Sequence, residues 1–414
     1  MAAGFAGGDS RRGVALTTIR IHDIAHGGEA VGRLDGKAVF VDGAFPGEVV
    51  DVEILEERNS WSRAALVSIV EPSGDRIVPA CRHFGRCGGC QWQYAAREIQ
   101  AVWKRDVVIG QLRHLGKIDD PDVRQTVTPG PAFAYRNRMD FRVQQGRPAL
   151  HRRRSRELEM LDGCPLLAEP LRAMLDEMGD LSPMHRVTLR AGINTGDRLA
   201  VVSGPVPEAA HQWSFPVCRV RRGRPEPIGG APFLRETIGD TTFRVTASAF
   251  FQNNTAGAEV LVDLVGAALD VAPADTLLDA YAGGGLFSLT VGRSAGRVLA
   301  VESAGMAVDD LVHNRGTAGI EVEVVASTVD GGINRGEWTV VVCDPPRSGL
   351  GADGVASITR STPRTIAYVA CDPASLARDA RLLGEVGYDL DYAVPVDMFP
   401  QTFHVETVAR FQLR

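Results

Sequence analysis

Short apolar runs separated by glycine-containing turns characterise residues 14–70. The runs are ALTTIRIHDI, HGGEAVGRL, DGKAVFV, GEVVDVEIL and SRAALVSIV. Runs of this length with turn residues between them are typical of short β-strands, and a set of five fits a small barrel of the oligonucleotide-binding kind. The pattern therefore predicts a barrel over 14–70, preceded by a loose tail over 1–13.

Beyond the barrel the pattern changes twice. After a proline- and glycine-containing linker, residues 79–240 combine clustered cysteines, one stretch with helical apolar spacing (AAREIQAVWKRDVVIGQLRHLG) and many β-type runs. From 241 to 414, apolar runs alternate with helical patterns, which is typical of a parallel α/β sheet. We expect an α/β protein with a barrel, a central mixed α/β domain over 79–240 and a C-terminal Rossmann-like domain over 241–414.

The composition is that of a soluble globular protein. Of the 414 residues, 44% are hydrophobic and 23% are charged, and no apolar stretch is long enough to cross a bilayer. The first residues lack the basic leader and continuous apolar segment of a signal peptide. These features predict a cytoplasmic protein that does not bind membranes, and we expect a monomer.

The charge is distributed unevenly. A net charge of -6 argues against a wholly basic nucleic-acid coat. Between Tyr135 and Met160, however, eight arginines stand against three acidic residues. The arginines are Arg136, Arg138, Arg142, Arg147, Arg152, Arg153, Arg154 and Arg156. A solvated face explains such a run, and so does phosphate contact, which the forked guanidinium donors suit.

A glycine loop follows the first strand of the C-terminal domain. TLLDAYAGGGLFSLTVG predicts a strand over Thr276–Tyr281, a loop from Gly283 and then a helix. Nineteen positions after Gly283, the next strand ends on Glu302, where a carboxylate accepts hydrogen bonds from ribose hydroxyls. The spacing indicates a nucleoside pocket. Ser288 at the third fingerprint position disfavours NAD, although an NAD-linked oxidoreductase stays an alternative.

Two further runs end on residues with reactive side chains. The run WTVVVC ends before Asp344 in DPPRSGL, and IAYVA ends before Cys371. Arg347 follows the two prolines where amino-methylating enzymes usually have an aromatic residue, so methylation of an exocyclic nitrogen fits poorly. Strands of an open parallel sheet direct their carboxyl ends to one crevice, so Asp344 and Cys371 should share a cleft with Gly283 and Glu302.

A cysteine beside a methyl-donor site has a specific use. Addition of a thiolate to C6 of uracil makes C5 nucleophilic enough to accept a methyl group. A base must then remove the C5 proton, and Glu406 in FHVETVARFQ is a candidate, with His404 near it in sequence. The alternative readings are a buried inert cysteine, which Cys218 and Cys343 fit, and a solvent-facing strand residue at Glu406.

Five motifs taken together resemble a known family. FFQNN (250–254), LLDAYAGGGLFSL, DPPRSGL, YVACDPASLARD and HVETV resemble, in order and spacing, the landmarks of the RNA uracil-5-methyltransferases that use S-adenosylmethionine. The N-terminal barrel is similar to the TRAM domain of that family. The resemblance therefore covers nearly the whole chain and implies a class I methyltransferase fold at its C-terminal end.

The resemblance implies roles for individual residues. Cys371 would be the nucleophile and Glu406 the proton acceptor. The S-adenosylmethionine site would be lined by Gln252, Tyr281, Gly283, Glu302 and Asp344. The chain departs from the family pattern at Ala282, Leu286, Ala370 and Asp372. A non-catalytic RNA-binding or assembly protein that kept the pocket is the alternative that these departures leave open.

The same resemblance gives the clustered cysteines a meaning. Cys81, Cys87 and Cys90 have the spacing C-x5-C-x2-C, and Cys164 follows downstream. Four thiolates can bind a [4Fe-4S] cluster, whereas zinc is the chemical alternative and disulfides fit a cytoplasmic chain poorly. The resemblance favours the cluster in a structural role.

A barrel together with four cysteines is more similar to the ribosomal branch of this family than to the compact transfer-RNA branch. Structured RNA is therefore the expected partner. The expected target is a uridine of 23S ribosomal RNA, and transfer RNA is the alternative.

Overall fold

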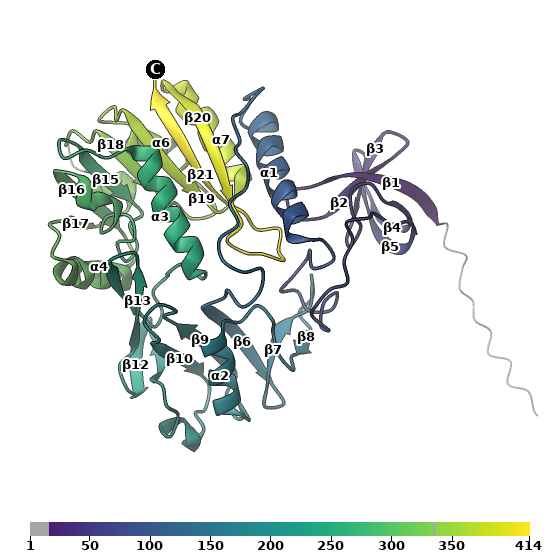
Figure 1. Cartoon of the computed structure of the whole chain (residues 1–414), viewed down its shortest axis with the longest axis horizontal. Helices are drawn as coiled ribbons and strands as arrows, with labels where there is room; N and C mark the ends of the chain where they lie inside the picture. Colours follow the sequence, from purple (N-terminus) through teal and green to yellow (C-terminus); the bar gives the residue numbers. More distant parts are fainter. Residues whose placement is uncertain (1–15, 334–335) are drawn as a thin grey trace, which may run out of the picture. The chain divides into compact units, whose positions relative to one another are not determined.

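The computed structural model describes residues 16–333 and 336–414, so the predicted tail over 1–13 lies outside the described residues. The chain divides into two compact units. One comprises the chain up to Val78 together with Tyr94–Ala96, and the other comprises Pro79–Gln93 and Arg97–Arg414. Figure 1 shows the course of the chain. In the described residues, no helix is both long and apolar enough to span a membrane.

The first unit is a closed barrel with the strand order β1-β2-β3-β5-β4. Its strands are β1 (Thr17–Ile24), β2 (Ala30–Leu34), β3 (Lys37–Val41), β4 (Val49–Glu57) and β5 (Trp61–Glu71). Alternate side chains such as Ile19, Ile21, Val50 and Val52 are buried, as the two-residue period of a strand requires. The expected N-terminal barrel is confirmed.

A mostly antiparallel sheet with the order β12-β11-β10-β9-β6-β7-β8 forms the central part of the second unit. Its strands are β6 (Arg138–Gln144), β7 (Arg147–His151), β8 (Leu158–Met160), β9 (Arg186–Ala191), β10 (Arg198–Ser203), β11 (Val217–Arg221) and β12 (Arg224–Gly229). Helix α2 (Glu169–Met178) packs on one face of this sheet through Leu171, Met174 and Met178. The short 3-10 helix η1 (Glu208–His211) follows β10.

The C-terminal sheet has the order β17-β16-β15-β18-β19-β21-β20, and β21 runs antiparallel to both of its neighbours. Its strands are β15 (Thr276–Ala280), β16 (Arg297–Glu302), β17 (Glu323–Ala326), β18 (Val340–Cys343), β19 (Thr365–Ala370), β20 (Tyr388–Val396) and β21 (Glu406–Leu413). A hairpin of β13 (Phe233–Ile238) and β14 (Thr241–Thr246) precedes them. The expected α/β architecture is confirmed.

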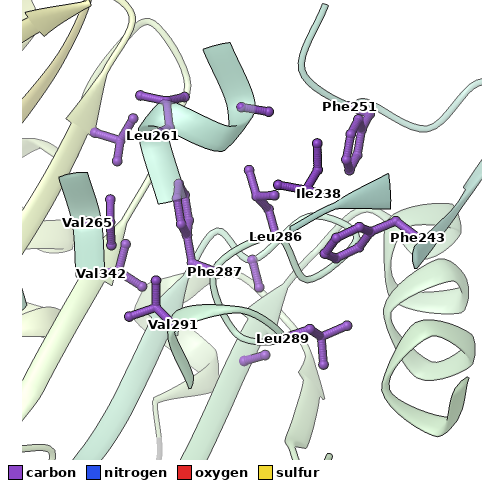
Figure 2. Packing of buried hydrophobic residues seen from close by; sticks show 14 of the residues in the cluster. Ile238, Phe243, Phe251, Leu261, Val265, Leu286, Phe287, Leu289, Val291 and Val342 are labelled. Carbon is purple, nitrogen blue, oxygen red and sulfur yellow. The ribbon is translucent and has the colours of Figure 1, made fainter. Parts of the chain in front are cut away.

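Helices cover both faces of this sheet, which explains why its strands are continuous apolar runs. The helices of the second unit are α1 (Arg97–His114), α3 (Thr255–Leu269), α4 (Gly305–Ala318), α5 (Val329–Gly332), α6 (Gly351–Ile358) and α7 (Pro373–Glu385), with the 3-10 helix η2 (Val291–Ser294). On one face, Leu261 and Val265 of α3 pack with Phe287 and with Val342 of β18, as Figure 2 shows. On the other face, α1, α6 and α7 pack against Val341 and Tyr368.

Helix α1 is tied to the segment between β20 and β21 by a buried ion pair. Lys104 donates to Asp397, and neither side chain has any solvent exposure. The Lys104 ammonium also donates to the carbonyl of Phe399 at 3.1 Å. Helix α1 packs beside α7. Residues 79–240 and 241–414 belong mostly to one compact unit, so the contacts within the chain give no boundary at residue 240. The division at residue 240 stays a prediction.

We expect Lys104→Met to lower the free energy of unfolding by about 3–5 kcal/mol, because Asp397 would stay buried without its closest counter-charge. Urea denaturation measures this change. Arg381→Ala is the matched control, since Arg381 and Glu385 form an exposed pair on α7 and their separation should cost under about 1 kcal/mol. Equal effects of the two substitutions would contradict the assignment of Lys104–Asp397 as a structural tie.

Candidate active site

Parallel strands bring three predicted site residues to one edge of the C-terminal sheet. In register, Ala280 of β15 lies beside Cys343 of β18, and Cys343 lies beside Tyr368 of β19. The residues that follow β15 and β18 directly are Tyr281 and Asp344, and Cys371 follows β19. Ligands of open α/β sheets bind at this carboxyl edge.

Antiparallel pairing of β19 and β21 places Glu406 next to Cys371. Ala370 pairs with Thr407, and Cys371 and Glu406 are the next residues on their respective strands. Because the strands run in opposite directions, the end of β19 meets the start of β21. Two residues that are 35 positions apart in sequence therefore lie side by side. The alternative of a solvent-facing strand residue at Glu406 is wrong, since Glu406 is only 6% exposed.

The Glu406 carboxyl is held in conditions that favour its neutral form. One of its oxygens, Oε2, is buried and has no hydrogen-bond partner among the residues that the structure describes. Burial raises the pKa of Glu406 well above its usual value, the charge of Asp344 raises it further, and Arg347 lowers it. A carboxyl with a raised pKa in a buried position suits proton transfer near neutral pH.

The same charges act on the Cys371 thiol. Burial raises the pKa of Cys371 to about 12, with further raising contributions from Glu406, Asp344 and Asp372, whereas Arg347 lowers it. The Asp372 side chain also caps α7 by accepting from the Ser375 amide at 2.8 Å. The raised pKa favours the thiol form of Cys371, and Arg347 is the cation that opposes this effect.

The backbone conformation and the hydrogen bonds of the glycine loop are those of a loop that can bind a ligand. Tyr281, Gly283 and Gly285 have positive φ angles of 67°, 55° and 96°. A Cβ on Gly285 would lie 2.5 Å from a methyl group of Leu311, so only glycine fits there. Glu302 accepts from the Gly283 amide at 2.8 Å through Oε2.

Glu302 also accepts two more backbone hydrogen bonds. The amides of Ser303 and Ala304 donate to its Oε1 at 2.8 and 2.7 Å. These bonds fix the orientation of the carboxylate. Each carboxylate oxygen has two acceptor positions, so Glu302 retains one of them, on Oε2, for a ribose hydroxyl.

Asp279 is a site residue that sequence reasoning missed. It lies fully buried in β15, and the amide of Ser288 donates to its Oδ2 at 2.8 Å. Oδ1 has no hydrogen-bond partner within 16–333 and 336–414, and burial raises the pKa of Asp279 to about 7. The available signal was an acidic residue within an apolar strand before a glycine loop. Ser288, taken from sequence as a departure from the NAD fingerprint, is the residue that orients it.

Gln252 lies in a segment that the central sheet holds in place. The side-chain amide of Asn137 donates to the Gln252 carbonyl at 3.1 Å. Nη1 of the buried Arg190 donates to the carbonyls of Thr246, Ala247 and Ala249. Between these contacts, Phe250 projects a ring that is 61% exposed.

The neighbouring Phe251 belongs to the same hydrophobic cluster as Ala282 and Leu286. This packing brings the segment 246–254 to the glycine loop. Gln252 itself is buried, and its backbone carbonyl is bonded to the central sheet through Asn137.

The four predicted cysteine ligands surround one cavity. Cys81, Cys87, Cys90 and Cys164 line a space of about 200 Å³. Burial raises the pKa of Cys90 to about 12 and also raises the pKa of Cys87 and Cys164, and neighbouring cysteines add to each effect. The arrangement disfavours four bare thiolates, so a cation bound to them would be needed to balance their charge.

The cysteine side chains are arranged around a space rather than a single point. Within 16–333 and 336–414, no three His, Cys, Asp or Glu side chains are close enough to hold one metal ion. The cavity that the four cysteines share is nevertheless well above the roughly 30 Å³ that a water molecule occupies in the liquid.

Comparison with known proteins identifies relatives over nearly the full length. Residues 16–67 match the TRAM domain family. An uncharacterized RNA methyltransferase of Streptomyces coelicolor is 35% identical, covering 94% of this chain and 91% of the relative. Another, of Gloeobacter violaceus, is 32% identical and covers 95% and 96%.

A solved structure is similar over the same extent. The crystal structure of Pyrococcus abyssi tRNA (uracil-54, C5)-methyltransferase in complex with S-adenosyl-L-homocysteine superimposes with a TM-score of 0.77 at 25% sequence identity. The match covers 95% of this chain and 100% of that one. Both units of the present chain thus have counterparts in known proteins.

We expect Arg347→Gln to slow alkylation of Cys371 by iodoacetamide and to move its pH midpoint upward, because removal of the positive charge raises the thiol pKa. Arg347 is exposed, so the shift should be largest at low ionic strength. Mass spectrometry of the Cys371 peptide measures the rate. Arg347→Lys should retain the wild-type profile, and an unchanged profile for Arg347→Gln would show that Arg347 does not act on the sulfur.

Proposed function

The chain belongs to the RNA methyltransferases, and we propose that it transfers a methyl group from S-adenosylmethionine to C5 of a uridine. The single observation that supports this most is the placement of Glu406 beside Cys371 at the carboxyl edge of the sheet. A nucleophile and a proton acceptor are the two groups that C5 methylation of uracil requires.

The proposed reaction uses the two residues in sequence. As the Cys371 sulfur bonds to C6, the thiol proton passes to solvent water and the electron pair of the C5–C6 double bond becomes available at C5. S-adenosylmethionine would supply an electrophilic methyl group, which would bond to C5 while the electrons of the broken S–CH3 bond stay on the departing thioether. Glu406, in its ionised form at this stage, then accepts the C5 proton, the double bond re-forms, and the Cys371 sulfur leaves C6. The raised pKa of Glu406 suits this last transfer, because a more basic carboxylate accepts the proton more readily.

We assign the methyl donor to the glycine loop and the adjoining strand ends. Glu302 would accept from the ribose, Gly283 would allow close approach of the backbone, and Tyr281, Asp344 and Gln252 would line the remaining part. The positive φ of Tyr281 and the braced carboxylate of Glu302 support this assignment. Phe250 is exposed and available to stack on a base, which is the use that exposed aromatic residues have in RNA recognition.

We propose that the cysteine-lined cavity binds a [4Fe-4S] cluster. The donor set fits, since four thiols face an otherwise largely apolar cavity that includes Met139, Leu150 and Leu161. Zinc is the alternative for the same donors. The cluster would supply a cross-link between segments that are distant in sequence, which is a structural contribution rather than a redox step.

Ribosomal RNA is the proposed target, and transfer RNA is the second candidate. The combination of barrel and four cysteines supports the first. The Pyrococcus abyssi enzyme, whose name gives tRNA uracil-54 as its target, favours the second. Mapping of 5-methyluridine in both RNA classes from cells with and without the gene separates them.

Incubation with 5-fluorouridine RNA and S-adenosylmethionine should trap a covalent complex, because Glu406 cannot remove fluorine from C5 as it removes a proton. Denaturing gels with labelled RNA detect the complex. Cys371→Ala should form none and should lose methyl transfer, whereas Cys218→Ser should behave as wild type. Glu406→Gln should accumulate the adduct with ordinary uridine RNA. Methyl transfer by Cys371→Ala would rule out this mechanism.

Protein purified without oxygen should contain about four iron and four sulfide per chain, as one [4Fe-4S] cluster requires. Elemental analysis and visible absorbance measure this content. Cys164→Ser should lose most of the iron and lower the melting temperature, whereas Cys218→Ser, a buried cysteine outside the cavity, should lose none. One zinc per chain in place of iron would overturn the cluster proposal and leave the methyltransferase proposal unaffected.

A further inference from the structure

The arginines between Tyr135 and Met160 have different environments. Several of the eight face an acidic partner or a buried surface. Those with such surroundings include Arg136 at the cysteine cavity, Arg138 with Asp140, Arg147 with Asp162, and Arg152 with Glu157 and Glu159. Arg142 differs from these four, because it is exposed and makes no ion pair or side-chain hydrogen bond with the described residues.

The sheet register places a second arginine directly opposite Arg142. Arg142 of β6 pairs with Arg186 of β9, which is also exposed and without an ionic partner among the residues described. Cβ atoms of directly opposed residues lie about 4.5–5.5 Å apart, and like charges in that position are destabilising. Within the described part of the chain, no ion pair or side-chain hydrogen bond of these two arginines offsets this repulsion.

The carboxylate on the same face of β6 does not form an ion pair with either arginine of this pair. Asp140 precedes Arg142 on the same face of β6, but its Oδ1 accepts from the hydroxyl of Thr188. Its Oδ2 lies 3.4 Å from Nε of Arg138. The acceptors of Asp140 are thus engaged away from Arg142 and Arg186.

The face of the sheet that carries the pair can be assigned. Phe141 and Val187, the sequence neighbours of the two arginines, are buried in the core that includes α2. Side chains alternate along a strand, so Arg142 and Arg186 project from the opposite face.

The same face of β6 and β9 leads to the candidate active site. Arg190 lies on this face, four residues after Arg186 along β9, and it pairs with Arg138 of β6. Its guanidinium holds the carbonyls of 246–249, the segment that precedes the exposed Phe250 and the buried Gln252. Side chains on this face of β6 and β9 thus form a row. Arg190 lies at the end of the row beside the candidate active site, and the exposed pair Arg142 and Arg186 lies at the other end.

We propose that Arg142 and Arg186 together bind the phosphodiester backbone of the substrate RNA near the target nucleotide. Two guanidinium forks side by side present several donors to phosphate oxygens, and a bound phosphate removes their mutual repulsion. The proposal rests on the proposed function, since it requires an RNA substrate, and it specifies which arginines of the basic run contact that substrate.

The double variant R142Q/R186Q tests this site. Its binding to a 20-nucleotide oligouridine should weaken about 10-fold or more at low salt, because hydrogen bonds to charged groups are the stronger class. The slope of log affinity against log salt should fall by about 0.7 for each phosphate that the variant no longer binds. The melting temperature should stay the same or rise, since a like-charge pair is removed.

The matched control is R221Q/R224Q. Arg221 and Arg224 also pair across strands of this sheet and are exposed, with Arg221 4.0 Å from Glu226. They project from the α2 face, because Arg221 is four residues from Val217 on the same strand and Val217 packs in the α2 core. The control removes the same two charges and should leave affinity within about twofold of wild type.

Two outcomes would overturn the inference. The control could weaken binding as much as R142Q/R186Q does, or the salt slope of R142Q/R186Q could equal that of wild type. Radiolabelled methyl transfer by wild-type protein into total RNA is measured in parallel. If the wild-type protein transfers methyl groups and R142Q/R186Q binds RNA normally, only the phosphate site is refuted. If the wild-type protein binds RNA through the two arginines but transfers no methyl group, the proposed function is refuted and the phosphate site stays supported.

Discussion

The antiparallel placement of β21 between β19 and β20 is the constraint on which the site depends. A parallel strand in that position would begin at the opposite edge of the sheet. Because β21 runs the other way, its first residue meets the last residue of β19. Glu406 thereby reaches Cys371 without a long loop and within a hydrogen-bonded ladder. Backbone pairing of this kind fixes the two side chains more firmly than loop residues could be fixed.

The segment between β20 and β21 is held from the N-terminal side of the second unit. Gln401 accepts from the amides of Gln91 and Trp92, next to Cys90, and Tyr135 donates to the carbonyl of Pro400. The ion pair of Lys104 and Asp397 secures the same segment. Residues just beyond a cysteine of the cavity thus hold the loop that leads into Glu406. This connection explains why a region remote in sequence is packed with the C-terminal sheet in one compact unit.

The sequence pattern was sufficient to predict the strands and helices, but it was insufficient to predict which of them lie side by side. Glycine turns and alternating residues predicted the barrel, and the helical spacing over 95–116 corresponds to α1 at Arg97–His114. Asp344 and Cys371 could be assigned to strand ends because apolar runs stop there. The direction of β21 could not be predicted, since a strand looks the same in either direction, so the sequence suggested Glu406 as a base but could not place it beside Cys371.

A linear sequence pattern also omits charges and contacts that arise only in the fold, as three residues show: Arg347, Asp279 and Arg186. Arg347 was considered only as a missing aromatic residue, although its charge acts on both Cys371 and Glu406. Asp279 stands within an apolar strand, where its unpaired oxygen becomes evident only from the fold. Arg186 lies outside the arginine-rich run and joins Arg142 only through strand register.

The carboxyl groups of Asp279, Asp344 and Glu406 have a consequence for turnover in the proposed reaction. Each has a pKa raised first by burial, and negative charge on one raises the pKa of another. A sulfonium is positively charged before methyl transfer and becomes a neutral thioether afterwards. A bound sulfonium would favour the ionised form of these carboxyls and would be attracted to them, and this attraction would end once its methyl group has left, so the spent cosubstrate would be held less strongly than the donor.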